Sequence, residues 1–322
     1  MQSKKLIIST ITTAIVAIAI FFNFNNQKAP LVAIANYGPH ASLEASLAGL
    51  KKQLADEGFV ENKTVRYEIA DVNFDHALIP QMISKLKGQK PKVMVVKSTP
   101  IAQFAKGKIR DIPLVYNDIT DPIAAELIKD KSRSSGNMTG ASDMQDLKAL
   151  LTFVKSILPY AKTIGLLYAT CADNDTALVR MMNEAAEMMG MRVLSIPVDQ
   201  TRDIPIRMQE FKGKADFIYV GVSGPIQPAI PTVFREAQKM EIPLINAHEQ
   251  AVRDGLALAS FGVDYEAVGR NAGKLVAKLL NGSDIKTIAP IYPRSQDHKG
   301  FINRKQAEYY KIKIPENVEI TG

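Results

Sequence analysis

The sequence is poor in the residues that build metal centres, disulfides and sugar-stacking sites. Its 322 residues include one cysteine, four histidines and no tryptophan. The single thiol, Cys171, excludes a disulfide within the chain and a zinc site built on paired cysteines. The histidines, none of which has a partner at metal-ligand spacing, are His40, His76, His248 and His298. We therefore expect no metal ion, and the missing indole rings argue against a receptor that stacks sugars.

Motifs for nucleotide chemistry and nucleophilic catalysis are also missing. The chain has no P-loop, no Gly-x-Ser-x-Gly turn and no Gly-x-Gly-x-x-Gly fingerprint. Cys171 follows a predicted strand and is the one candidate nucleophile, but two-lobed cysteine racemases take one thiol from each lobe and this chain has one in all. We expect a half-buried structural cysteine, no enzyme activity and no cofactor, and keep an exported enzyme using Cys171 as the least favoured alternative.

The positive charge of the chain does not indicate a nucleic-acid partner. The formal net charge is +7, and residues 1–29 contribute three lysines and no acid to it. Beyond that segment, lysines and acids are interspersed and no basic run exceeds two residues. Such a pattern is typical of a solvated surface of mixed charge, so we expect no nucleic-acid binding.

The N-terminal segment is typical of an export signal. Met1–Lys5 is short and basic, and Leu6–Phe22 is apolar apart from four hydroxyl residues. The apolar run is long for a signal peptide and short for a membrane span, and Ala33-Ile34-Ala35, the one good cleavage motif, lies inside a predicted strand. Residues 1–29 are therefore interpreted as a signal peptide or an N-terminal membrane anchor, and both remain open. In either case we expect the body in the periplasm or on the extracytoplasmic face of the inner membrane.

Short apolar runs alternate with amphipathic segments through the rest of the chain. The predicted strands are 31–35, 65–69, 93–96 and 114–116, and then 163–168, 192–197, 216–220 and 243–246. Helices are predicted between them, for instance over 43–56, 78–86, 144–157 and 176–189. This alternation favours parallel sheets covered on both faces. Residues 112–117 are echoed by residues 242–247, which indicates two similar lobes.

The end of the chain holds too few elements for a third domain. A strand over 256–261, a helix over 264–280, a possible strand over 288–292 and a helix over 304–309 complete the prediction. We assign 31–141 plus 262–283 to one lobe and 142–261 plus 284–322 to the other. The predicted fold is α/β, with two doubly wound Rossmann-like lobes of parallel sheets joined by a multi-crossover hinge.

Polar loops follow the predicted strands, and ligands of open parallel sheets bind beyond the carboxyl ends of the strands. Pro100 is placed to begin a helix, so free amides near Ser98 and Thr99 would suit an anion, although a role of either residue as a helix cap fits equally well. The candidate ligand-binding residues from these loops are Asn36, Tyr37, His40, Ser42, Ser98, Thr99, Asp121, Asn174, Ser223, His248 and Glu249.

Several stretches, in order and over nearly the whole body, resemble a known family. They are Leu54–Lys63, Ser98–Gln103, Ile112–Val115, Thr120–Pro122, Gly136–Asp143, Leu158–Tyr168 and Gly255–Tyr265, followed by Gly269, Arg270 and Gly273. From Leu31 to about Val318 the chain is similar to the ABC-transporter substrate-binding proteins of the type I periplasmic fold. It resembles in particular the group that includes tryptophan- and aromatic-amino-acid-binding members.

The resemblance implies a receptor that closes about a hinge on a small solute. It would hand the solute to an ABC permease in the inner membrane, which a separate ATPase powers, and we expect it to act as a monomer. It also adds Tyr168 to the candidate site, beside Asn174. In amino-acid-binding members the helix start at Ser98 and Thr99 would hold the ligand carboxylate, and acidic groups would hold its ammonium.

The chain departs from the family pattern at two loops. Relatives often carry Asp-Asn-Thr where this chain has Ser223-Gly224-Pro225, and Ser-Asp-Thr where it has Ala247-His248-Glu249. Glu249 or Asp121 would then bind the ammonium group, or the solute belongs to another class; a protonated His248 would favour an anion. A membrane-tethered sensor or ligand-binding module is the main alternative function.

Overall fold

The computed structural model describes residues 29–316 and 318–322 of the chain. The interpretation of residues 1–29 as a leader or anchor therefore falls, except for residue 29, outside the described residues. Among the helices that are described, none is long and apolar enough to span a membrane.

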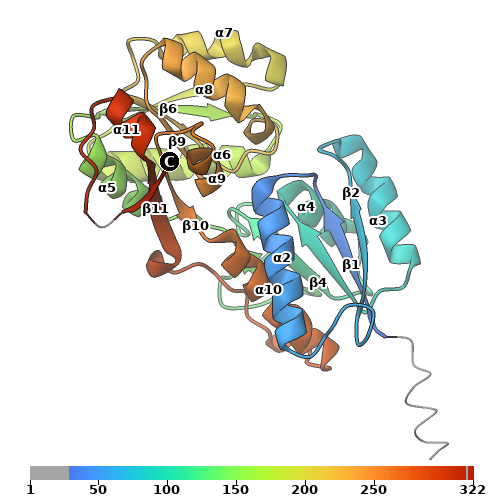
Figure 1. The fold of residues 1–322 in the computed structure, drawn as a ribbon. Helices are drawn as coiled ribbons and strands as arrows, with labels where there is room; N and C mark the ends of the chain where they lie inside the picture. The colour runs from blue at the N-terminus through green and yellow to red at the C-terminus, as the bar shows by residue number, and fades with distance from the viewer. Residues whose placement is uncertain (1–28, 317) are drawn as a thin grey trace, which may run out of the picture.

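The first lobe is built on a five-stranded parallel sheet. Its strands are β1 (Leu31–Asn36), β2 (Arg66–Asp71), β3 (Val93–Lys97), β4 (Leu114–Ile119) and β5 (Met138–Ser142), in the order β2-β1-β3-β4-β5. The central strands are buried on both faces, as their continuous apolar runs predict. Helices α2 (Ala41–Asp56) and α10 (Tyr265–Leu280) cover one face, and α3 (Ile79–Gly88) and α4 (Thr99–Lys108) cover the other (Figure 1).

The second lobe is built on a seven-stranded mixed sheet. It contains β6 (Thr163–Tyr168), β7 (Arg192–Pro197), β8 (Phe217–Val220), β9 (Leu244–Asn246), β10 (Ala259–Val263), β11 (His298–Asn303) and β12 (Glu319–Thr321), in the order β12-β11-β10-β9-β8-β6-β7. Only the β10–β11 pair among these strands is antiparallel. Helices α5 (Leu147–Ile157), α6 (Asp173–Met188) and α11 (Arg304–Tyr309) pack on one face, and α7 (Ile204–Met208), α8 (Ile230–Lys239) and α9 (Glu249–Arg253) pack on the other.

The chain crosses between the lobes after β5, after β10 and after α10. Helix α10, late in the sequence, lies beside α2 on the first lobe (Figure 1). Ile288, further along the chain, is buried in the same core, and Thr139 donates a hydrogen bond to its carbonyl oxygen at 2.9 Å. The predicted architecture of two α/β lobes joined by several crossovers is confirmed, with sheets that are mostly parallel.

Three predicted details differ from the structure. The possible strand over 288–292 is reduced to a single bridge between Ile291 and Ala141. The strand expected over 256–261 begins at Ala259, because Leu256 and Ala257 turn out of α9 before the sheet begins. Cys171, expected to be half-buried, is exposed in the loop before α6.

Candidate functional site

The carboxyl ends of the parallel strands of both lobes face each other and enclose a small cavity, the inner chamber. Its volume is about 30 Å³. The first lobe contributes the loops after β1, β2, β3, β4 and β5, and the second lobe contributes the loops after β6 and β8. The lining residues are Tyr37, His40, Ser42, Leu43, Phe74, Ser98, Thr99, Asp118, Thr120, Asp143, Asn174, Val222 and Gly224.

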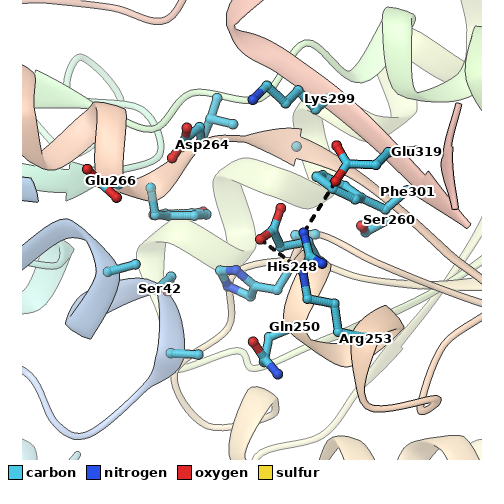
Figure 2. A pocket seen from close by; sticks show the side chains of 17 residues that line it. Ser42, His248, Gln250, Arg253, Ser260, Asp264, Glu266, Lys299, Phe301 and Glu319 are labelled. Carbon is cyan, nitrogen blue, oxygen red and sulfur yellow. Dashed lines mark hydrogen bonds and ion pairs between the residues drawn. The ribbon is translucent and has the colours of Figure 1, made fainter. Parts of the chain in front are cut away.

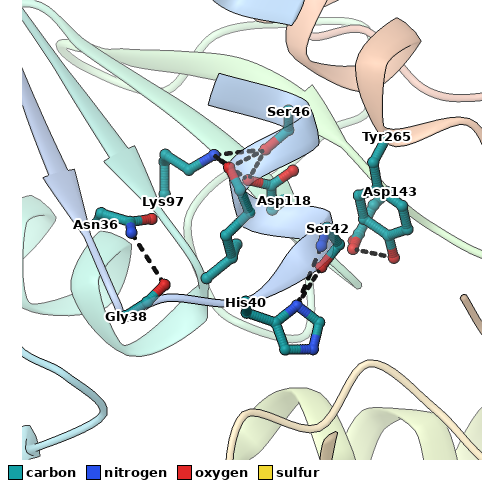
Figure 3. A network of polar contacts seen from close by, with 10 residues as sticks. Asn36, Gly38, His40, Ser42, Ser46, Lys97, Asp118, Asp143 and Tyr265 are labelled. Carbon is teal, nitrogen blue, oxygen red and sulfur yellow. Dashed lines mark hydrogen bonds and ion pairs between the residues drawn. The ribbon is translucent and has the colours of Figure 1, made fainter. Parts of the chain in front are cut away.

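A buried ion pair stands behind this chamber in the first lobe (Figure 3). The Lys97 ammonium, fully buried, lies 2.9 Å from Oδ2 of Asp118 and donates to the carbonyl oxygen of Leu43 at 2.7 Å and to the Ser46 hydroxyl. Ser46 donates in turn to Oδ2 of Asp118 at 2.7 Å. Burial lowers the pKa of Lys97, and the carboxylate of Asp118 opposes that shift. Oδ1 of Asp118 has no hydrogen-bond partner among the described residues.

Asp143 places a second buried carboxyl group in the chamber. Its Oδ2 accepts a hydrogen bond of 3.1 Å from the Tyr265 hydroxyl, and its Oδ1 is unpartnered within the described part of the chain. Burial, reinforced by the nearby Asp118, raises the pKa of Asp143 to about 7. The chamber therefore offers two carboxyl oxygens with a single buried cation behind them, which is an arrangement that favours a cationic ligand group.

The start of α4, in contrast to the two acids, favours an anionic ligand group. Ser98 has a positive φ of 75° and its side chain makes no capping bond, so the capping role is not observed for Ser98. The first-turn amides of Thr99 and Ile101 have no hydrogen-bond acceptor in the described residues. Free amides at the start of a ten-residue helix form a favourable site for a carboxylate.

An aromatic wall closes another side of the chamber. The Tyr37 ring packs edge-on against Phe74, with centroids 5.4 Å apart, and against His76 at 5.3 Å. From the second lobe, Gly224 approaches so closely that a Cβ there would lie 2.7 Å from Cε1 of Tyr37. Gly224, which stands where the family pattern often has asparagine, thus leaves room for the aromatic ring.

Asp175 organises the second-lobe loops beneath the chamber. It is buried and accepts hydrogen bonds from the Ala169 amide at 2.7 Å, the Ser223 hydroxyl at 2.6 Å and the Asn174 side chain at 2.8 Å. Burial raises its pKa to about 7. Ser223, a predicted ligand contact, therefore supports a loop and does not line the inner chamber, whereas Asn174 does.

The remaining candidate residues are distributed over the surroundings of the chamber. Asn36 is buried and donates to the carbonyl oxygen of Gly38, and Tyr168, at the end of β6, lines neither of the two inter-lobe cavities described in this section. Asp121 bridges the lobes, because its Oδ2 lies 2.8 Å from Nη2 of Arg180 on α6. His248 and Glu249 line a second cavity.

This second cavity, the outer chamber, also lies between the lobes (Figure 2). Its volume is about 360 Å³, and it is lined by the first turns of α2 and α10 from one lobe and by α9 and strands β10 to β12 from the other. Arg253 within it pairs with Glu249 at 3.3 Å and with Glu319 at 3.5 Å.

Sequence reasoning missed three chamber residues with evident chemistry: Phe74, Asp118 and Asp143. Asp118 lies near the end of β4, three residues before the predicted Asp121, and Asp143 ends a stretch that carries the family resemblance. Both acids directly follow or end buried strands, which is the signal that identifies them. Phe74 follows β2, an edge strand whose loop was not considered.

Two α/β lobes joined by three crossovers, with a chamber between the strand ends, define a solute-binding protein that closes on its ligand. A family model described as ABC transporter substrate binding protein matches residues 31–321, and the chain belongs to this family. The predicted family, fold and general function are thereby confirmed. It is a family of substrate-binding proteins and not an enzyme family.

Relatives of known ligand or structure extend the comparison. A tyrosine-binding protein of Clostridioides difficile (strain R20291) is 29% identical over 264 residues, covering 82% of this chain and 76% of the relative. A domain from Streptococcus pneumonia, solved in complex with L-Trp, is 28% identical, with a TM-score of 0.85 over 91% of this chain and 100% of that one. The ligand-free, open structure of a substrate binding protein with adhesive properties from Clostridium difficile is 27% identical and reaches a TM-score of 0.72 over 91% of this chain and 99% of that one.

The two structural comparisons differ in how well they superpose on this chain. Sequence identity is nearly equal in the two cases, yet the ligand complex superposes better than the open, ligand-free structure. Within the described residues the lobes touch each other through Arg180 with Asp121 and through Gln103 with Asp173, and this arrangement is called closed below.

Proposed function

We propose that this protein is the extracytoplasmic solute-binding component of an ABC importer and that its solute is a free amino acid with an aromatic side chain. The proposal includes a permease in the inner membrane with its separate ATPase, and a binding protein that acts as a monomer. Family membership supports the transporter partners, and the apolar, basic-flanked N-terminal sequence supports export.

One observation carries the choice of solute: three complementary groups surround one chamber. The free oxygens of Asp118 and Asp143 suit an ammonium group, the amide of Thr99 at the start of α4 suits a carboxylate, and Tyr37 with Phe74 suits an aromatic ring. The first lobe thus supplies acids to the inner chamber, whereas this chain has Ser223 and His248 where relatives often carry aspartate. Relatives that bind tyrosine and L-Trp agree with this assignment.

The chamber is smaller than an amino acid, so the solute enters while the lobes are apart. Contacts with the second lobe are made on closure, and they shift the open–closed equilibrium toward the closed form. Binding to the first lobe would then precede closure.

The test is a calorimetric and thermal-shift comparison on protein that begins at Ala29. L-Tyrosine, L-tryptophan and L-phenylalanine are expected to stabilise the protein. N-acetyl-tyrosine lacks the ammonium group, tyrosine amide lacks the carboxylate and glucose lacks all three recognised groups, so these compounds are not expected to stabilise it. Asp143→Asn is expected to weaken tyrosine binding by about tenfold to 100-fold, since it removes the charge and keeps the shape.

Asp111→Asn is the matched control, because Asp111 is exposed and pairs with Lys87 away from the chamber. Stabilisation by glucose alone, or equal binding of tyrosine and N-acetyl-tyrosine, would contradict the proposal.

A further inference from the structure

The inner and outer chambers adjoin, and two histidine rings lie between them. His40 lines the inner chamber, His248 lines the outer one, and Ser42 lines both. The ring centroids are 4.9 Å apart, with an interplanar angle of 63°. Figure 3 shows His40 at the start of α2 beside Ser42, and Figure 2 shows His248 at the wall of the outer chamber.

The two rings come from different lobes. Nδ1 of His40 accepts from the Ser42 amide at 3.3 Å and lies 2.6 Å from the Ser42 hydroxyl oxygen, which fixes the ring as the N-cap of α2. His248 follows β9, where its amide donates to Asn246 at 2.7 Å. Its ring packs across the lobe boundary against Tyr265 of α10, with centroids 4.8 Å apart. The two rings therefore meet only when the lobes are closed.

We propose that His40 and His248 are specificity-determining residues that limit the length of the solute. Their paired rings separate the inner chamber from the outer one. A solute longer by one peptide unit would have to displace the rings, whereas a single amino acid would not extend past them. This inference rests on the proposed function and extends it.

The outer chamber is large and polar enough to hold the additional part of a longer solute. Its volume of about 360 Å³ would accommodate an additional residue, and Arg253, Lys299 and Glu249 offer charged partners for a peptide terminus. Ser260, in its wall, has a buried hydroxyl without a hydrogen-bond partner among the described residues. Polar space for a longer solute is thus present and is closed off by the two rings.

The rings are uncharged in the closed form, which allows them to touch. Burial lowers the pKa of His40 to about 4, with Lys97 contributing, and lowers the pKa of His248 well below its ordinary value, with His40 contributing. Asp118 and Asp143 face them from the inner chamber, and Glu249 and Arg253 lie in the outer one. A neutral aromatic pair excludes solute by its volume and not by its charge.

The experiment compares affinities for L-tyrosine, Ala-Tyr and Tyr-Ala at pH 8 by calorimetry. The wild-type protein is expected to bind tyrosine at least about 100-fold more tightly than either dipeptide. In His248→Ala the chambers join, and this ratio is expected to fall about tenfold or more for at least one dipeptide. His248→Phe restores a ring of similar size and is expected to keep the wild-type ratio.

Gln250→Ala is the matched control, because Gln250 also lines the outer chamber but is exposed and lies outside the ring pair. Melting curves of each variant establish that it is folded. The inference is overturned if the wild-type protein binds a dipeptide as tightly as tyrosine, if His248→Ala keeps the wild-type ratio, or if His248→Phe loses it. A wild-type protein that binds neither tyrosine nor a dipeptide would overturn the proposed function itself, and this inference with it.

Discussion

Asp143 is both a buried carboxyl group with a raised pKa and the proposed partner of the solute ammonium group. Burial and the neighbouring Asp118 raise its pKa to about 7, so the carboxyl group is partly protonated at neutral pH. An ammonium group that binds there favours the ionised form, and solute binding then releases a proton whenever the empty protein carries one. Solute affinity should therefore depend on pH.

We predict that tyrosine affinity is highest near pH 8 and decreases as the pH falls below 7. The steepest decrease expected is about tenfold in affinity per pH unit for each proton that must be released on binding. The raised pKa of Asp143 and the lowered pKa values of His40 and His248 act in the same direction, because binding with closure requires the first ionised and the other two neutral. Calorimetry between pH 5 and pH 9 measures this dependence.

Asp143→Asn provides the control for this prediction. It should bind more weakly at pH 8 and show a shallower decrease toward pH 5, with the histidines responsible for what remains. An affinity that is independent of pH, or that rises in acid, would show that these groups do not face the solute.

At the scale of single residues, the sequence predicts which loops form the site better than it predicts which side chains line it. Tyr37, His40, Ser42, Ser98, Thr99 and Asn174 were expected at the site and do line the inner chamber. Whether each contacts solute stays a prediction. Asp118 and Asp143 were missed because their orientation depends on Lys97 and Tyr265, which lie 21 and 122 positions away in the sequence. No local pattern encodes such partners.

At the scale of elements, the close packing of α2 against α10 joins an early and a late part of the chain. Glycines make this approach possible: a Cβ on Gly49 would overlap the carbonyl oxygen of Glu266, and one on Gly269 would overlap that of Ser46. Ser46 also belongs to the Lys97–Asp118 network behind the inner chamber. The helix contact and the chamber are therefore mechanically linked.

We predict that Gly269→Ala lowers the free energy of unfolding by about 1–3 kcal/mol, because the added methyl group forces the two helices apart. Denaturant unfolding measures the change. Gly107→Ala is the matched control within α4, since a Cβ there meets no atom within 4 Å. The free energy of unfolding of that variant should equal that of the wild type or exceed it by up to about 1 kcal/mol, because alanine has a higher helix propensity than glycine. Equal losses in the two variants would contradict the helix-contact explanation.

The elements were predictable where burial dictates an apolar run. The central strands and the long helices α2, α6 and α10 agree with the sequence pattern to within a few residues. Strand β5 was not predicted because its sequence, Met-Thr-Gly-Ala-Ser, has no apolar run. Its polar side chains Thr139 and Ser142 are nevertheless buried, because they donate hydrogen bonds to the carbonyl oxygens of Ile288 and Ile119. Strand β11 begins with His-Lys-Gly and is only partly buried, so its pattern does not resemble a core strand.

At the scale of the whole molecule, function depends on the free-energy difference between open and closed lobes. Few polar contacts join the lobes outside the chambers. Arg180 of α6 bridges to Asp121, and Gln103 of α4 donates to Asp173 at 2.7 Å. These contacts are absent when the lobes part, so they contribute to apparent affinity without touching the solute.

We predict that Arg180→Ala weakens tyrosine binding about twofold to fivefold, because the exposed Arg180–Asp121 pair contributes at most about 1 kcal/mol to closure. The effect should shrink as salt is raised from 20 mM to 500 mM, since salt screens exposed charges. Glu184→Ala is the matched control: Glu184 binds the same guanidinium at 2.9 Å but belongs to the same helix and lobe, so its loss should leave affinity unchanged. Calorimetry gives the affinities, and small-angle scattering gives the fraction of closed protein at a fixed tyrosine concentration. If Glu184→Ala weakens binding as much as Arg180→Ala does, the arginine acts within α6 alone, and closure must depend on the chamber contacts.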